Sequence, residues 1–340
     1  MKKTKSKSKK ISKPYGKLIL ISIGLISAGF LFLSAFPEVE PVETTMPERR
    51  EEEKRKEEKD EVIRLAFVGD IMLNRGVLFR AENENDPALP FRKIKDRLHE
   101  PDIMFGNLES MISDQGFDQG GEFSFRAPPK MMEGLILADF DVMSIANNHS
   151  FDWGVDALTD TEKRLEKEGI VPVGGGLDAY EPKIIEKNGQ SFAFIAHTGL
   201  GASGWVPTDN TPGVALYDEA ELRRSIEKVK GKVDAVIFSI HYGIEYETKP
   251  SQNQIDISKN AIDMGADLVI GHHPHVIQPV EEYEGGIIAY SLGNFVFDQD
   301  FSEETMEGLL LEVDFKEGEI VNFEKEVVPM NQNFQPHIDN

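Results

Sequence analysis

The feature that most constrains the fold is an alternation, from about residue 62 onward, of short apolar runs with longer amphipathic segments. Apolar runs rich in β-branched and aromatic residues favour buried strands, and strands that alternate with helices predict an α/β protein. We expect strands at residues 63–68, 103–105, 142–146, 191–197, 235–241, 268–270 and 287–291. We expect helices at residues 91–99, 130–138, 155–168, 219–230 and 252–264, and a C-terminal hairpin of 308–315 with 319–328.

Composition narrows the classes of function. The 340 residues, 40% of them hydrophobic, suffice for one large domain or two ordinary ones. The net charge is −23, so the chain repels nucleic acid, whose binding needs Lys and Arg to displace counterions from phosphate. The chain has no cysteine, so any metal site must be built from His, Asp, Glu or Asn.

The amino-terminal region predicts membrane attachment. Residues 18–36 form an apolar run behind a lysine-rich tail at 1–17, and that run is long enough to cross the ~30 Å hydrocarbon core as a helix. Because the lysines favour the cytoplasmic side, we expect the rest of the chain outside the cell membrane. A cleaved signal peptide and a buried core helix are the alternatives. Residues 37–61 are dense in Glu, Lys, Arg and Pro and predict a solvated stalk, so the folded domain is expected at 62–340.

Polar side chains recur where the predicted strands end. They are Asp70; Asn107 and Glu109; Asn147, Asn148, His149 and Asp152; His241 and Glu245; and His272, His273 and His275. Singly, each has an ordinary explanation, because an Asp after a strand often caps a turn and a buried His is often just hydrogen-bonded. Turn chemistry does not call for repeated histidine, however. The set therefore indicates a divalent cation such as Mn, Fe or Zn.

Six motifs carry a family resemblance. In order they are GDIM, GNLES, ANNHSFDWG, HYGIEY, GHHPHVIQPVE and YSLGNFVFDQ, spread over residues 63–315. This series resembles the CapA-type poly-γ-glutamate (capsule) synthesis proteins, a branch of the calcineurin-like metallophosphatase superfamily. The resemblance implies a sandwich of two β-sheets flanked by helices, with a metal centre where the strand ends meet.

The resemblance also implies roles for single residues. The metal ligands of the superfamily fall on Asp70, Asn148, His241, His273 and His275. The proton donor falls on His149, and either Asp152 or Glu109 would hold its tautomer.

Two departures change this pattern. The superfamily's first motif is Asp-x-His, but the third position here is Met72, a weak ligand for these ions. Its bridging aspartate is replaced by Asn107, with Glu109 the nearest carboxylate. We therefore expect one complete site from Asn148, His241 and His273, and a weaker one from Asp70, His275 and Glu109. We leave His272 out and expect it to face solvent.

Three functions fit these features. The first is a membrane-anchored, extracytoplasmic component of poly-γ-glutamate synthesis or export, working with membrane subunits of the polymer synthase. The second is a free-standing envelope metallophosphatase or phosphodiesterase, and the third is a structural subunit with a non-catalytic metal. A rim of Arg75, Arg80, Arg92, Lys93 and Lys95 would help either of the first two functions to bind an anionic polymer or a phosphorylated substrate. Alternatively, that rim is only a solvated helix face.

Overall fold

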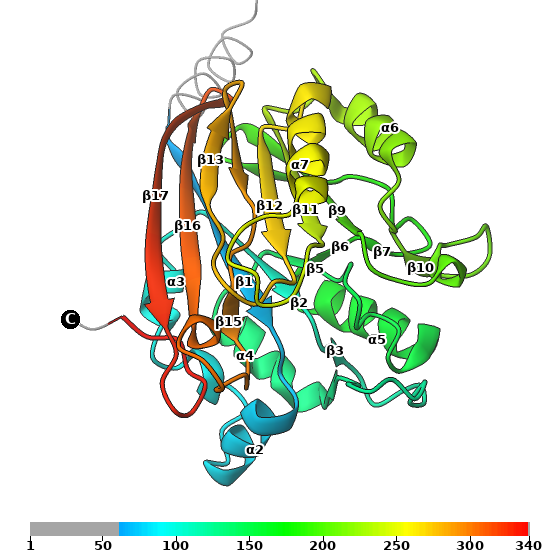
Figure 1. The fold of residues 1–340 in the computed structure, drawn as a ribbon, viewed down its shortest axis with the longest axis vertical. Coiled ribbons are helices and arrows are strands. Elements are labelled where there is room, and N and C mark those ends of the chain that lie inside the picture. Colours follow the sequence, from blue (N-terminus) through cyan, green and yellow to red (C-terminus); the bar gives the residue numbers. More distant parts are fainter. Residues whose placement is uncertain (1–60, 339–340) are drawn as a thin grey trace, which may run out of the picture. The chain divides into compact units, whose positions relative to one another are not determined.

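Two β-sheets form the framework of the protein (Figure 1). The structure is a computed structural model, and it describes residues 61–338. The first sheet contains, in spatial order, β17 (Glu319–Pro329), β16 (Glu307–Lys316), β1 (Ile63–Ile71), β2 (Ile103–Leu108), β5 (Val142–Ser144) and β6 (Val171–Val173), and β15 (Asn294–Val296) also pairs with β1. The second contains β13 (Val280–Tyr283), β14 (Gly286–Ala289), β12 (Leu268–His272), β11 (Ala235–His241), β9 (Gln190–Thr198) and β8 (Lys183–Lys187). Two small pairs are β3 (Met111–Ile112) with β4 (Arg126–Ala127), and β7 (Gly175–Gly176) with β10 (Gly213–Val214).

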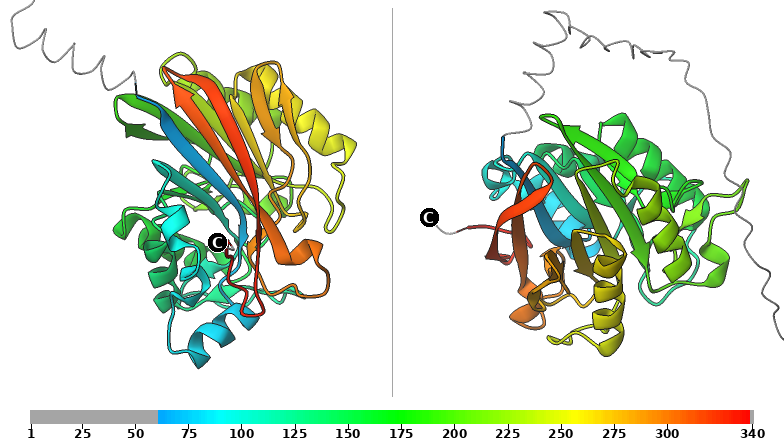
Figure 2. Two further views of the ribbon diagram at one scale, coloured as in Figure 1. Left: turned by 90° about the vertical axis from the view of Figure 1, so that its left-hand side faces the viewer. Right: turned by 90° about the horizontal axis from the view of Figure 1, so that it is seen from above.

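The two sheets pack against each other through aromatic side chains. Side chains alternate between the two faces of a strand, and in β9 Phe192 and Phe194 face the first sheet. The ring of Phe194 stacks on Phe105 of β2 at a centroid distance of 5.9 Å, and Phe192 meets Phe315 of β16 at 5.4 Å. Ile195 faces the other way, into a second apolar cluster. Figure 2 shows the strands of the two sheets side by side from two further directions.

Helices cover the outer faces of the sandwich. They are α2 (Arg75–Asn83), α3 (Lys95–Leu98), α4 (Met132–Leu137), α5 (Gly154–Lys167), α6 (Glu219–Val229) and α7 (Gln252–Met264). Helices α6 and α7 lie over the second sheet and complete its apolar cluster. The ends of α7 follow from its sequence, because Ser251 and Gln254 form a capping box and Gly265 takes the left-handed conformation at φ 117°.

The expected elements are mostly confirmed. All seven expected strands form, as do the C-terminal hairpin and four of the five helices. The helix expected at 91–99 is wrong: a 3₁₀ turn at Leu89–Phe91 and the short α3 replace it. The apolar residues that suggested this helix, Phe91, Ile94 and Leu98, are all buried by the two short turns. We did not predict α2, which buries only Val77 and Ala81 and so has little apolar periodicity.

The predicted membrane span at 18–36 and nearly all of the predicted stalk at 37–61 lie outside the described residues. Between residues 61 and 338, no helix combines the length and the apolar character needed to cross a membrane. The first strand, β1, begins at Ile63.

One core residue is an unusual choice for its surroundings. His197 of β9 is fully buried, and within the described part of the chain neither of its ring nitrogens has a hydrogen-bond partner. It packs edge-on against the rings of Tyr180 and Phe238, at centroid distances of 5.3 and 5.4 Å. Because burial disfavours the charged imidazolium, the pKa of His197 falls to about 3.

This histidine makes stability depend on pH. The unfolded chain takes up a proton at His197 below about pH 6.5, whereas the folded chain does not until about pH 3, so stability is lost as pH falls between those values. His197→Leu removes the buried polar group at similar volume. We predict that lowering the pH from 7 to 4 reduces the unfolding free energy of this variant by about 3 kcal/mol less than it reduces that of the wild type. Urea titrations at both pH values measure this difference, and equal losses in the two proteins would refute the prediction.

Candidate metal centre

Strand register brings the polar strand ends to one place. In the first sheet, Asp70 of β1 lies opposite Asn107 of β2 and opposite Asn294 of β15. In the second sheet, His241 of β11 lies opposite His272 of β12. All these strands run parallel to their partners, so their carboxyl ends meet at one edge, where α/β folds commonly bind ligands.

The turn after β12 aims two histidines into this space. His273 and His275 both have positive φ, at 96° and 58°, a conformation that non-glycine residues rarely adopt. Such strained backbone is concentrated at functional sites. The His273 ring lies 4.9 Å from the His241 ring and 5.8 Å from the His275 ring, measured between centroids. The structure therefore brings these three predicted ligands together.

Asp70 lies at the centre of the cluster and is fully buried. Its Oδ1 accepts a hydrogen bond from Asn107 Nδ2 at 2.8 Å, and its Oδ2 accepts one from the backbone N–H of His273 at 3.1 Å. His272 Nδ1 and His275 Nδ1 lie 3.4 and 3.3 Å from the carboxylate oxygens. Burial alone would raise the pKa of Asp70, but its contacts with the two histidines hold it well below its usual range.

Glu109 is the clearest sign that this site suits a cation. The side chain is fully buried, and in the described part of the protein neither carboxylate oxygen has a hydrogen-bond partner. Burial and the nearby Asp70 charge raise the pKa of Glu109 well above its usual range. Burial lowers the pKa of His275, but the carboxylates of Glu109 and Asp70 outweigh it and raise that pKa to about 9. The field here thus favours positive charge, and a divalent cation would satisfy the orphaned carboxylate.

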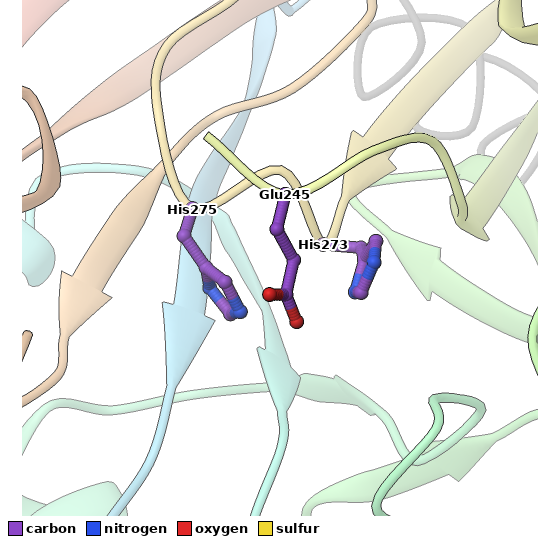
Figure 3. Close-up of side chains that lie close together, drawn as sticks. All are labelled: Glu245, His273 and His275. Carbon is purple, nitrogen blue, oxygen red and sulfur yellow. The ribbon is translucent and has the colours of Figure 1, made fainter. Parts of the chain in front are cut away.

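Two sets of donors have metal-binding spacing, and they share His275. Atoms of Asp70, Glu109 and His275 lie within 4.8 Å of one another, and so do atoms of Glu245, His273 and His275. Figure 3 shows the Glu245 carboxylate between the two imidazoles. Sequence reasoning noted Glu245 at its strand end but did not assign it as a ligand. The HYGIEY motif was the available signal.

Asn294 is a second residue that sequence reasoning missed. Its Nδ2 donates to the Thr305 carbonyl at 2.9 Å, which directs its Oδ1 to His275 Nδ1 at 2.9 Å. Because this oxygen can only accept, Nδ1 of His275 keeps its proton and Nε2 is the nitrogen left for a metal.

Asn148 and Asn107 flank His241. His241 Nε2 lies 2.8 Å from Asn148 Oδ1, and its Nδ1 lies 3.3 Å from Asn107 Nδ2. The amide of Asn107 therefore occupies the space between Asp70 and His241. Its Nδ2 donates to Asp70, so this position presents a hydrogen-bond donor and not a second carboxylate.

His272 and Met72 are both buried beside the centre. His272 was expected to face solvent, and this was wrong: it is fully buried, with its ring 6.2 Å from the Phe105 ring. The register of β12 directs it inward beneath Asp70. Met72 is also fully buried, and its sulfur accepts a hydrogen bond from the Asn74 backbone N–H at 3.1 Å.

His149 and Asp152 form a hydrogen-bonded pair at the rim. His149 Nδ1 lies 2.7 Å from Asp152 Oδ2, and the same oxygen accepts the Phe125 backbone N–H at 2.8 Å. Asp152 thus keeps the proton on Nδ1 and leaves Nε2 facing Glu109 Oε1, 3.7 Å away. Of Asp152 and Glu109, the two carboxylates expected to hold the tautomer of His149, Asp152 makes the hydrogen bond. The Phe125 ring packs on the imidazole at a centroid distance of 4.0 Å.

Comparison with known proteins places these residues inside a family region. Residues 64–299 match the sequence model of the family described as bacterial capsule synthesis protein PGA_cap. The chain is 32% identical over 330 residues to the PGA biosynthesis protein CapA of Bacillus subtilis (strain 168), covering 95% of this chain and 82% of that protein. It is 31% identical over 336 residues to the capsule biosynthesis protein CapA of Bacillus anthracis, covering 96% and 78% of the two chains.

A solved structure shares the fold. The crystal structure of a hypothetical protein from Thermus thermophilus aligns with a TM-score of 0.50 at 18% identity. The alignment covers 78% of this chain and 98% of that one. The mixed α/β sandwich is therefore a known architecture.

We predict that metal binding depends on His241 and His273 more than on Asp70, because the set that contains Asp70 has Met72 in place of its histidine. The double variant His241→Ala/His273→Ala should lose most of its bound metal and melt at lower temperature, since metal binding contributes to folding. Asp70→Asn should retain more metal. Elemental analysis of the purified proteins tests this, with His99→Ala, which is remote from the site, as control. Equal metal in the wild type and the double variant would refute it.

Proposed function

Because the chain belongs to the bacterial capsule synthesis protein family PGA_cap, we propose that it takes part in the synthesis or export of the capsule polymer poly-γ-glutamate. The observation that carries this proposal is the extent of the match. The family region spans residues 64–299 and includes every metal-competent residue of the site. Two relatives, one named for PGA biosynthesis and one for capsule biosynthesis, align with nearly the whole chain.

The site supports a metallophosphatase-like role within that function. Carboxylate and imidazole donors without thiols suit Mn, Fe or Zn. A divalent cation bound there supplies Lewis acidity toward a phosphoryl or carboxyl oxygen. His149 would transfer a proton at Nε2, Asp152 holds its tautomer, and Phe125 shields the imidazole from water. The substrate would be the anionic polymer or a phosphorylated precursor.

We further propose that residues 18–36 anchor the chain in the cell membrane and that residues 62–340 lie outside. The lysines at the amino terminus support this orientation. The natural partners are then the membrane subunits of the polymer synthase.

A second function is favoured by one observation. The pairing of His149 with Asp152 beside the orphaned Glu109 would equally serve a free-standing envelope phosphatase or phosphodiesterase. Turnover of p-nitrophenyl phosphate esters by the purified chain with added Mn, with normal capsule in a strain lacking the protein, would favour this alternative. Loss of capsule without such turnover favours polymer synthesis.

We predict that His149→Ala lowers capsule yield while leaving bound metal nearly unchanged. A positioned general acid contributes about 10²–10⁴-fold to a rate, which is large enough to appear as loss of function in cells. Polymer yield from a complemented deletion strain is measured beside the metal content of the purified variant. Asn148→Ala is the matched control, because removal of a neighbouring ligand should lower metal and stability together. A His149→Ala protein that loses its metal would make His149 a ligand; one that keeps full activity would support a structural role for the site.

We predict that protease added to intact cells removes the folded domain, because the lysine-rich tail stays in the cytoplasm. Immunoblotting against the C-terminal residues measures the loss, with a cytoplasmic protein as control. Cleavage only after lysis would contradict the proposed topology.

A further inference from the structure

A cavity of about 300 Å³ opens beside the candidate metal centre. His149, His275 and Glu245 line it on the side of the metal centre, and the remaining wall is largely aromatic, formed by Phe123, Phe125, Tyr246, Phe297 and Phe301. Phe123 and Phe301 are 60% and 63% exposed, which is costly for side chains that serve only packing. A volume this small suits a compact ligand, or one unit of an extended one, rather than a folded partner.

Arg75 introduces a permanent positive charge into this cavity. Of the described residues that line it, Arg75 is the only lysine or arginine. Its Nε and Nη2 donate to the two carboxylate oxygens of Asp298, at 3.1 and 2.6 Å. None of the described residues accepts a hydrogen bond from Nη1, so that edge of the guanidinium remains available to a ligand.

Two contacts hold the guanidinium in place. Asp298 forms a bidentate ion pair with the guanidinium and also accepts a hydrogen bond from the Gly76 backbone N–H at 2.8 Å. A Cβ at position 76 would lie 2.9 Å from Asp298 Oδ2, so glycine is what permits this approach. The Arg75 guanidinium carbon lies 5.2 Å from the Phe125 ring centroid, and Arg75 itself has a φ of 50°. An arginine fixed in this way loses little entropy when it binds an anion.

Resting on the proposed function, we propose that Arg75 is the residue that recognises the anionic group of the ligand in this site. The ligand class is a compact carboxylate or phosphate with an apolar or planar body. The oxyanion bonds to Nη1 of Arg75, and the body lies against the aromatic wall. Arg75 thus recognises the substrate, while His149, which lines the same cavity, transfers the proton.

Charge explains why such a residue is needed. Glu245 lines the cavity, and among residues 61–338 the Asp298 carboxylate forms an ion pair only with Arg75. Without the guanidinium, an anionic ligand would meet the unpaired carboxylate of Asp298. The ion pair with Asp298 also orients the planar guanidinium of Arg75. A lysine ammonium has no such planar pair of N–H groups and would not be oriented in the same way.

Calorimetric titration of the full-length, metal-loaded chain tests this proposal, with inorganic phosphate and glutarate as probes. Arg75→Gln should weaken binding of the preferred probe by about 10- to 100-fold, because a hydrogen bond to a charged group is lost. Arg75→Lys keeps the charge and packs in the same space, and it should recover only part of the affinity. The preferred probe separates a carboxylate ligand from a phosphate ligand.

Arg80→Gln is the matched control, since it removes one charge from the same helix outside the cavity. It should bind both probes as the wild type does. The proposal is overturned if Arg75→Gln and Arg75→Lys both bind like the wild type, if Arg80→Gln weakens binding equally, or if the metal-loaded wild type binds neither probe. A wild type that holds no metal would instead overturn the metal centre and, with it, the proposal that rests on it.

Discussion

The hydrogen bonds of the buried Asp70 carboxylate hold together the strand ends that form the site. It accepts hydrogen bonds from Asn107 in the first sheet and from the backbone of His273 beyond the second, and it lies against His272 and His275. One side chain therefore ties the ends of both sheets together. A buried charge is tolerated only when it is paired and hydrogen-bonded, so each of these partners is positioned by the need to compensate it.

Close packing of the backbone makes this convergence possible. A Cβ at Gly69 would lie 1.9 Å from the Gly293 carbonyl oxygen, and one at Gly271 would lie 2.1 Å from that of Tyr290. Each of these glycines directly precedes a polar residue of the centre, Asp70 or His272. The chain therefore uses glycine where strands must approach closely, and the next residue delivers its side chain to the site.

The centre and the cavity together address an electrostatic problem. The chain carries a net charge of −23, yet its proposed ligands are anions. A cation at the carboxylate and histidine cluster and the guanidinium of Arg75 would provide two fixed positive charges in a small aromatic enclosure. Because local charges in a cavity of low polarity outweigh a screened surface charge, an acidic protein can still bind an anion there.

By itself, the sequence determined the α/β class, the strands and the set of metal-competent residues, because apolar periodicity and strand-end chemistry are local properties. It predicted one site from Asn148, His241 and His273 and a second from Asp70, His275 and Glu109, and the structure places the members of each set near one another. Tertiary structure decided the rest. Buried His272, the Asn294 contact with His275, and the Arg75 pair with Asp298 depend on register and on contacts between residues far apart in the chain. Such pairings leave no periodic trace in the sequence, so only the folded chain reveals them.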